Sequence, residues 1–541
     1  MSETSKPLTA APAGRGSVVF RGGRILTMDP ACPRASVMAS HGGRLTYVGD
    51  DFWAALETLP GEAEVVELKN RNVIPGLIDS HAHVMGEGLR LSQLDLAGLD
   101  YREALETVAE EAAKREPGAW IHGRGWDQNL WDAGWPAKEG LDRAAPNNPV
   151  VFDRIDKHSI WVNSLALERA GVTAGAADPP GGEIVRGRNA EPAGVLIGQA
   201  MHLVYQAMPP NDGLDFLCTF KKSVGELLGF GLTTIVDCAV RPADYPVIAG
   251  AVASGEVKAR LRLYFLAEPW TGGLLDRGPE SGLCGGRLSL DGLKLFSDGS
   301  LGSRSAWLLE GYSDRQGYRG GHVYSDEALE AVLTRARDVG WQVAVHVIGD
   351  AAVNQAVNCM GRVLGFERTE RNWRLEHYQV AAEADQEKVL SMGLIPSIQS
   401  VGLMTDLHMA GSRLGPERLR RAYAWRGIID RGGYIVNGSD CPIESPNPFL
   451  GIYAAITRKD LKGEPPGGFG PEQALSRKEA LLSYTVWPAR AAFASDCIGS
   501  LSAGKFCDFA VLDRDLFTCP ERAVAGTRIM STVVGGEVVA G

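Results

Sequence analysis

The stretch Val73-Ile-Pro-Gly-Leu-Ile-Asp79-Ser-His81-Ala-His83 decides the fold class. An apolar run ends in a carboxylate and two histidines. Residues two apart on a strand share one face, so the two imidazoles can hold one metal ion. The histidine pair alone is weak evidence, because surface and core histidines are common. Its position after an apolar strand favours a ligand role, since barrel enzymes place catalytic groups at such strand ends.

Further apolar strands follow, and amphipathic stretches such as Asp326–Val339 and Ala351–Leu364 lie between some of them. This alternation is typical of βα units around a parallel sheet, and eight strands close a barrel. We therefore expect an α/β protein built on a (β/α)8 TIM-type barrel. The eight expected strands are Val73–Asp79, Leu232–Cys238, Arg260–Leu266, Gly292–Phe296, Gln342–Val347, Trp373–His377, Ile395–Gln399 and Tyr434–Gly438.

Both ends of the chain have short strand patterns bounded by Gly and Asp. Residues 17–27 are expected to form two strands around a Gly-Gly turn. We expect a flexible tail over residues 1–16, a small β-sandwich from both termini (17–70 with 490–541), and a barrel domain over 71–489. The gap after the first strand is longer than a crossover needs. It predicts a large inserted subdomain at about 84–230, lying over one end of the barrel.

The composition narrows the function classes. Lys and Arg number 55 against 66 Asp and Glu, a net charge of −11, which argues against nucleic-acid binding. No apolar run approaches the roughly 20 residues of a membrane helix. The N-terminal residues lack the apolar core of a signal peptide. The nine cysteines include no CxxC pair. We therefore expect a cytoplasmic protein with no membrane or nucleic-acid partner.

Three further side chains end predicted strands: His346, His377 and Asp440. Each has a structural alternative, since a core histidine can bond to backbone and an aspartate often caps a helix. However, the carboxyl ends of barrel strands converge on one mouth. Four of the ten histidines in the chain fall at these ends. We therefore predict a metal centre formed by His81, His83, His346, His377 and Asp440.

Lys294, within the apolar segment Gly292–Phe296, has two interpretations. It can pair with a carboxylate, the usual arrangement for a buried cation. Alternatively, burial favours the neutral amine, which can capture CO2 as a carbamate that bridges two cations. The sequence pattern leaves both open.

The ordered motifs resemble the amidohydrolase superfamily, specifically its amidohydrolase-3 branch of YtcJ-like proteins and N-substituted formamide deformylases. The resemblance spans roughly residues 20–540. Its motifs are Pro75–His83, Lys294–Ser300, His346–Asp350, Leu375–His377, Gly438–Pro442 and Gly499–Asp508, with Cys507 where the family usually has Ala.

This resemblance implies that His81, His83 and Asp440 hold one metal, that His346 and His377 hold a second, and that a carbamylated Lys294 bridges them. Some members keep a single metal. Imidazole and oxygen ligands suit Zn, with Mn, Fe or Co as alternatives.

The expected reaction is hydrolysis of an amide-type C–N bond by metal-activated hydroxide, with Asp440 as general base and then acid. An N-substituted formamide or related amide is the substrate implied by the resemblance, and a homodimer the implied assembly. The alternatives are a hydrolytic deaminase or a cyclic amide or imide ring-opening hydrolase. A non-enzymatic relative is disfavoured by the complete ligand set.

The insertion carries Trp126, Trp131, Trp161 and His158 in segments that resemble branch-specific motifs. They are candidate substrate-binding residues for an apolar or aromatic group, although a tryptophan cluster can equally be subdomain core. Arg304, after the fourth strand, is a further candidate. Its alternative is a surface salt bridge.

Overall fold

We describe a computed structural model of the chain over residues 16–128, 131, 135–154, 159–179, 182–187, 190–208, 216–267, 270 and 272–541. The tail expected over 1–16 lies outside these residues, except for Gly16. The chain forms two compact units. The first is Met1–Glu87 with Ser223–Gly541, and the second is Gly88–Lys222.

Eight parallel strands form the central sheet of the first unit. The sheet closes between its first and last strands, because the Asp440 amide donates to the His81 carbonyl. The TIM-type barrel expected from the sequence is thereby confirmed. Its strands are β6 (Leu77–Ala82), β13 (Leu232–Val240), β14 (Arg260–Leu266), β16 (Leu288–Phe296), β17 (Gln342–Val347), β18 (Arg374–His377), β19 (Ile395–Ile398) and β20 (Val436–Asn437).

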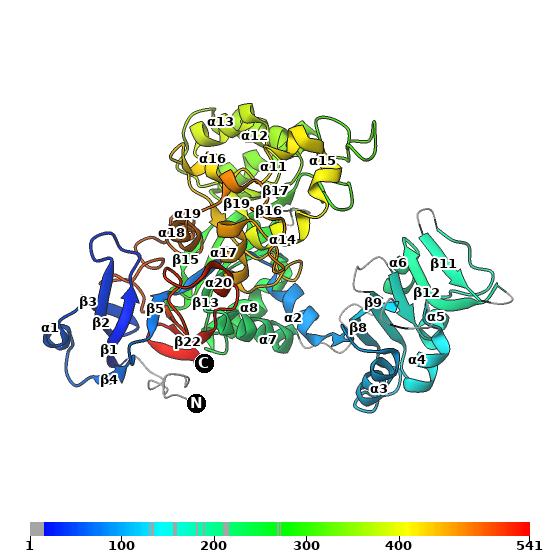
Figure 1. Cartoon of the computed structure of the whole chain (residues 1–541), viewed down its shortest axis with the longest axis horizontal. Helices are drawn as coiled ribbons and strands as arrows, with labels where there is room; N and C mark the ends of the chain where they lie inside the picture. Colours follow the sequence, from blue (N-terminus) through cyan, green and yellow to red (C-terminus); the bar gives the residue numbers. More distant parts are fainter. Residues whose placement is uncertain are drawn as a thin grey trace. The chain divides into compact units, whose positions relative to one another are not determined.

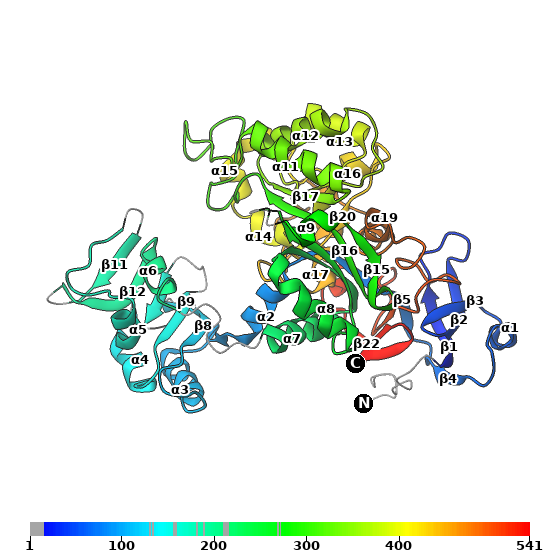
Figure 2. The same cartoon turned by 180° about the vertical axis from the view of Figure 1, so that it is seen from behind.

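Helices connect these strands, and Figure 2 shows α7 and α8 on one side of β16 and β17 and α11 and α12 on the other. The helix α11 illustrates how the sequence sets its bounds. Ser325 caps its first turn by accepting from the Ala328 amide, and Gly340 ends it at a φ of 101°, a conformation that glycine adopts without strain. The principal helices are α7 (Phe216–Gly229), α8 (Tyr245–Ala253), α11 (Asp326–Val339), α12 (Asp350–Leu364), α13 (Glu383–Met392), α15 (Ala410–Leu419), α17 (Pro448–Thr457), α18 (Arg477–Leu482) and α19 (Val486–Ala491).

The two ends of the chain share a second sheet, in the order β23-β22-β21-β5-β1-β2-β3 with β4 beside β1. Figure 1 shows the blue N-terminal strands and the red β22 in the first unit. Phe20 and Phe509, from opposite ends of the chain, pack edge to face in its core. The strands are β1 (Ser17–Leu26), β2 (Arg34–His41), β3 (Arg44–Gly49), β4 (Glu64–Glu67), β5 (Asn72–Pro75), β21 (Phe509–Leu512), β22 (Ile529–Val534) and β23 (Glu537–Ala540).

Two strand predictions were wrong at this sheet. The expected barrel strand Val73–Asp79 is divided at Gly76: its first half, β5, pairs with β21 in the terminal sheet, and the barrel strand β6 begins at Leu77. A Cβ at Gly76 would lie 2.1 Å from Thr233 Oγ1, so this crossing point requires glycine. Conversely, residues 17–26 form one strand with an irregularity after Arg21, instead of two strands.

The second unit contains a six-stranded sheet in the order β11-β12-β10-β9-β8-β7. Helix α3 packs against α4 and β8 within this unit. The strands are β7 (Leu94–Asp95), β8 (Ile121–Trp126), β9 (Val150–Arg154), β10 (Ser159–Val162), β11 (Gly182–Arg186) and β12 (Pro192–Gly198), and the helices include α3 (Tyr101–Ala112), α4 (Lys138–Ala144), α5 (Ser164–Arg169) and α6 (Met201–Tyr205).

Candidate metal centre

Three potential metal ligands meet at the carboxyl ends of the first and last barrel strands. His81 lies in β6, His83 follows that strand, and Asp440 follows β20. Asp440 Oδ1 is 3.0 Å from His83 Nε2 and 3.4 Å from His81 Nε2. A ring nitrogen of each histidine and a carboxylate oxygen lie within 4.8 Å of one another. The donor set and its spacing fit one divalent cation.

The second ring nitrogen of each histidine has its own partner. His81 Nδ1 lies 2.5 Å from Glu376 Oε2, and His83 Nδ1 lies 2.7 Å from the Cys238 carbonyl oxygen. Both partners accept hydrogen bonds, which assigns the proton to Nδ1 in each ring. Nε2 is therefore the free ligand atom, and it is the atom that faces Asp440.

Glu376 is a residue whose role the sequence analysis missed. It is fully buried, and its other oxygen accepts from Arg374 Nε at 2.8 Å. Arg374 also donates to the Ser80 carbonyl at 2.6 Å, so the pair spans β18 and β6. A signal was present in the sequence: opposite charges two residues apart on a buried strand must share one face and require partners.

Lys294, His346 and His377 complete the constellation predicted from the sequence. Lys294 is buried in β16, with Nζ 3.2 Å from His81 Nε2. The His377 ring centroid lies 5.1 Å from that of His81 and 4.4 Å from that of His346. His346 Nε2 also lies 3.3 Å from the Gly299 carbonyl oxygen, a contact that a metal bound to this nitrogen would have to replace.

Burial keeps His81, His346 and His377 neutral, whereas at His83 the interaction with Asp440 outweighs burial and raises the pKa. Burial lowers the pKa of His81 to about 4 and that of His377 to about 3, and it holds the pKa of His346 well below its usual range. The Lys294 charge adds to the effect at all three rings. Neutral imidazole is the protonation state that metal ligation requires.

Asp440 is held as a carboxylate. Burial alone would raise its pKa, but at the low pH where His81 is itself protonated, the charge of His81 and the contact with His83 outweigh burial and hold the pKa of Asp440 far below its usual range. Asp440 and His377 have φ values of 57° and 71°. Such left-handed conformations are uncommon for residues other than glycine, and they persist where the surroundings enforce them.

Asp79 and Asp298, two buried aspartates of the motifs, use their carboxylate oxygens to accept hydrogen bonds from neighbouring segments. They therefore hold the segments around the site in place. Asp79 accepts from the amides of His81 and Ser439 and from the Ser439 hydroxyl, which ties β6 to the segment after β20. Asp298 accepts from the amides of Ile348, Gly349 and Trp307. Burial raises the pKa of Asp79 to about 6 and that of Asp298 to about 7.

The candidate substrate-binding tryptophans lie in the core of the second unit. Trp126 and Trp161 are fully buried, and Trp131 stacks on Trp126 with ring centroids 5.9 Å apart. The indole nitrogens of Trp126, Trp131 and Trp161 donate to the backbone carbonyls of Phe152, Leu99 and Ala137. This packing accords with the alternative of subdomain core, and a substrate role for these side chains stays a prediction.

The last two candidate substrate-binding residues are His158 and Arg304. His158 lies outside the described residues. Arg304, at a φ of 59°, forms a two-point ion pair with Asp314. This ion pair accords with a surface salt bridge, the alternative to a substrate-binding role, which stays a prediction.

A sequence comparison decides the family. The protein-family sequence model described as "Amidohydrolase family" matches residues 64–540 of this chain. The chain belongs to the amidohydrolase family. The resemblance seen in the motifs is thereby confirmed.

Curated relatives of this amidohydrolase align over nearly all of its length. It is 32% identical to the protein LONG AFTER FAR-RED 3 of Arabidopsis thaliana, over 99% of this chain and 93% of that protein. It is 31% identical to the putative amidohydrolase YtcJ of Bacillus subtilis (96% and 99%) and 26% identical to the N-substituted formamide deformylase of Arthrobacter pascens (95% and 96%).

A solved structure supports the same relationship. An uncharacterised metal-dependent hydrolase from Pyrococcus horikoshii superimposes with a TM-score of 0.77 at 26% identity, covering 94% of this chain and 99% of that one. Among the described residues, no helix combines the length and apolar character needed to cross a membrane.

Proposed function

We propose that this amidohydrolase is a metal-dependent hydrolase that cleaves an amide-type C–N bond in a small molecule. The observation that carries the proposal is the group formed by His81, His83 and Asp440 at the carboxyl ends of β6 and β20. Both histidines present Nε2 because their Nδ1 protons are already used. The metal-dependent hydrolase from Pyrococcus horikoshii supports the assignment.

In the proposed site, a divalent ion held by these three residues would lower the pKa of a bound water and polarise the substrate carbonyl. Asp440 takes a proton from the attacking water and returns it to the leaving nitrogen, as general base and then general acid. The first of these roles requires the carboxylate form, which is the form of Asp440 at neutral pH. Zn is the proposed ion, with Mn, Fe or Co as alternatives, because the donors are imidazole nitrogens and a carboxylate oxygen.

Lys294, His346 and His377 are proposed to hold a second ion. Lys294 Nζ is close enough to His81 Nε2 that a carbamate formed on it would reach the same space. A carbamate would also replace a cation by an anion beside three neutral histidines. Lys294→Ala should then reduce the bound metal from two ions to one, with partial rescue by short carboxylic acids. Elemental analysis showing the same single ion in both proteins would remove the bridging role.

An N-substituted formamide or related amide is the proposed substrate class, motivated by the similarity to the Arthrobacter pascens deformylase. The test is a screen of the purified protein against N-substituted formamides, other amides, cyclic imides and aminated heterocycles, before and after chelator treatment. We expect turnover of an amide that is lost with the metal and restored by Zn or Mn. Metal-independent turnover, or turnover confined to the heterocycles, would contradict the proposal.

A further inference from the structure

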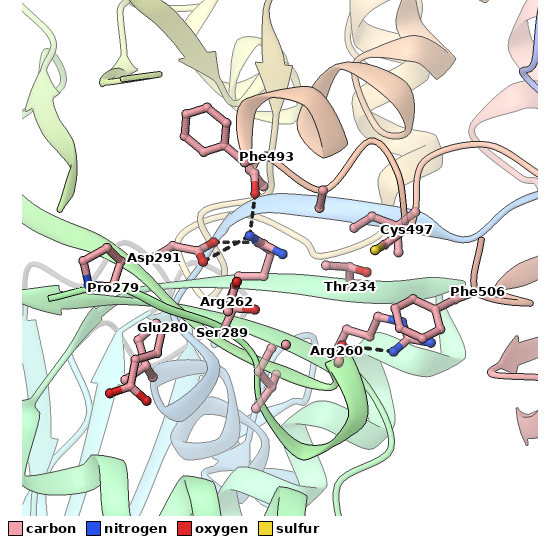
Figure 3. A pocket seen from close by; sticks show the side chains of 18 of the residues that line it. Thr234, Arg260, Arg262, Pro279, Glu280, Ser289, Asp291, Phe493, Cys497 and Phe506 are labelled. Carbon is pink, nitrogen blue, oxygen red and sulfur yellow. Dashed lines mark hydrogen bonds and ion pairs between the residues drawn. The ribbon is translucent and has the colours of Figure 1, made fainter. Parts of the chain in front are cut away.

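Figure 3 shows a cavity of about 820 Å³. It lies at the amino ends of barrel strands, whereas the metal ligands lie at the carboxyl ends. Its floor is formed by the first residues of several barrel strands: Thr234 of β13, Arg260 of β14, Ser289 of β16 and Gln342 of β17. The chain between α19 and β21 supplies the other wall, including Phe493, Cys497 and Phe506. The catalytic site proposed above uses none of these residues.

Two of the arginines in the cavity are neutralised. Arg260 forms a buried two-point ion pair with Asp508, at 2.5 and 2.9 Å. Arg262 forms a similar pair with Asp291, at 2.5 and 3.0 Å, and also donates to the Ala492 carbonyl. Both pairs join barrel strands to neighbouring elements and have a structural role.

Two further arginines have no carboxylate partner in the part of the chain that the structure describes: Arg44, which is exposed to solvent, and Arg287, which is partly buried. Among the described residues, no carboxylate oxygen lies within 4.0 Å of Arg44 or Arg287, whose hydrogen bonds go to the carbonyls of Gly504 and Lys258. Arg287 lines an adjoining cavity of about 610 Å³ that shares Gly42, Arg260, Gly285 and Phe506 with the first. Burial, with Arg260 nearby, lowers the pKa of Arg287. Two carboxylates, Glu537 and Asp508, attract Arg287, but they are bonded to Lys258 and Arg260.

A polar atom also faces this cavity without a partner. Thr234 is 1% exposed, and its hydroxyl has no hydrogen-bond partner within the described part of the chain. An unsatisfied buried hydroxyl destabilises the folded chain, so such groups in native proteins call for an explanation. A ligand atom in the cavity would supply the partner.

The apolar part of the cavity is built around Phe506, which Figure 3 shows beside Arg260. The Phe506 ring centroid lies 3.5 Å from the Arg260 guanidinium carbon and 4.1 Å from that of Arg44. Phe493 also lines the cavity and is 63% exposed. The two adjoining cavities thus combine aromatic surface with two arginines that form no ion pair among the described residues, in a protein whose net charge is −11.

We propose that this cavity binds a small organic anion with a flat apolar body. The acid group lies by Arg44 and Arg287, where charge-assisted hydrogen bonds are strongest. The body packs against Phe506 and Phe493, and Thr234 supplies one hydrogen bond. The site is separate from the metal centre.

Calorimetric titration of the full-length protein with 2-naphthalenesulfonate tests this proposal, because a sulfonate is a poor metal ligand. We expect saturable binding, weakened about tenfold or more by Arg44→Gln or Arg287→Gln, since a hydrogen bond to a charged group contributes about 1.5–3 kcal/mol. Arg102→Gln, at an exposed position in the second unit, is the matched control and should bind like the natural protein. The neutral 2-naphthalenemethanol should bind at least tenfold more weakly.

Thr234→Val gives a readout that does not depend on charge. In the absence of 2-naphthalenesulfonate, the Tm of the Thr234→Val variant should be higher than that of the natural protein, because an unsatisfied hydroxyl is removed. The increase in Tm that the probe produces should be smaller than in the natural protein. Absence of binding to the natural protein would overturn the proposal. So would an affinity unaffected by both arginine substitutions, or one abolished by Asp440→Asn.

Discussion

At the residue scale, the chemistry depends on how a few polar atoms are held. Glu376 fixes the His81 ring by accepting from Nδ1, and Arg374 fixes Glu376 in turn. Carboxylates in this position orient the imidazole and strengthen it as a ligand. Neither charge is exposed to solvent, so the pair must be treated as one unit.

Glu376→Gln should lower metal affinity about 10–100-fold, the usual effect of removing such a partner. The glutamine side chain keeps the shape of the site but loses the charge on which His81 and Arg374 both depend. Competition with a chromophoric chelator measures the affinity. Glu370→Gln, at an exposed position, is the control, and equal affinities in all three proteins would show that Glu376 has no part in metal binding.

Asp440→Asn should keep the fold and lose about 10²–10⁴-fold in kcat, the range of general acid–base contributions. Asparagine tolerates the left-handed backbone at this position, so the substitution is mild structurally. Circular dichroism and turnover of the best amide found by screening are the two measurements. Near-normal kcat would assign the proton transfer to another group.

At the element scale, the site depends on how the first and last barrel strands meet. Gly438 lies between them: a Cβ there would be 2.4 Å from the His81 amide nitrogen and 2.8 Å from Asp79 Oδ1. The strand β20 has only two residues, Val436 and Asn437. Much of the closure therefore rests on Asp79 and on the bond from the Asp440 amide to the His81 carbonyl.

Gly438→Ala should destabilise the protein by about 1–3 kcal/mol, the usual cost of overpacking, and should weaken metal binding because His81 must shift. Gly225→Ala is the matched control. Gly225 lies within α7, where an added Cβ meets no atom within 4 Å, so the same change should be neutral or stabilise by up to about 1 kcal/mol. Urea unfolding compares the two. Equal stabilities would show that the strands can separate without cost.

At the scale of the whole molecule, the two compact units have separate cores. The tryptophan cluster belongs to the second unit, in which Tyr101 and Phe152 also pack against Trp161. Because Trp161 is completely surrounded by other side chains, it contributes mainly to the stability of the second unit. The packing therefore gives no support to an apolar or aromatic substrate, an inference that rested on these tryptophans lining the pocket.

Trp161→Ala should cost about 3–5 kcal/mol, as is typical for a buried tryptophan, and should impair small and bulky substrates alike. Thermal unfolding and KM for a graded substrate series are the measurements. Trp53→Ala, at a site that is 72% exposed, should change neither. A rise in KM confined to bulky substrates, with unchanged stability, would restore the pocket role.

The sequence by itself determined the fold class and the residues most suited to bind metal. Strand β17 and helix α11 were predicted with their observed bounds, because a buried strand and a capped amphipathic helix are encoded by local pattern. His81, His83 and Asp440 could be selected because strand ends converge in a barrel. Local pattern could not show that Val73–Pro75 leaves the barrel for the terminal sheet, since its partner β21 lies more than 400 residues along the chain.

Only the tertiary structure assigned Glu376 to His81, which are 295 residues apart, and placed the tryptophans in a core. It alone revealed the cavity beside Arg44 and Arg287. Each of these depends on contacts between distant segments, and the energy of burying a charge or a ring is set by what surrounds it after folding. The sequence names the chemical groups, whereas their partners and their burial exist only in the folded chain.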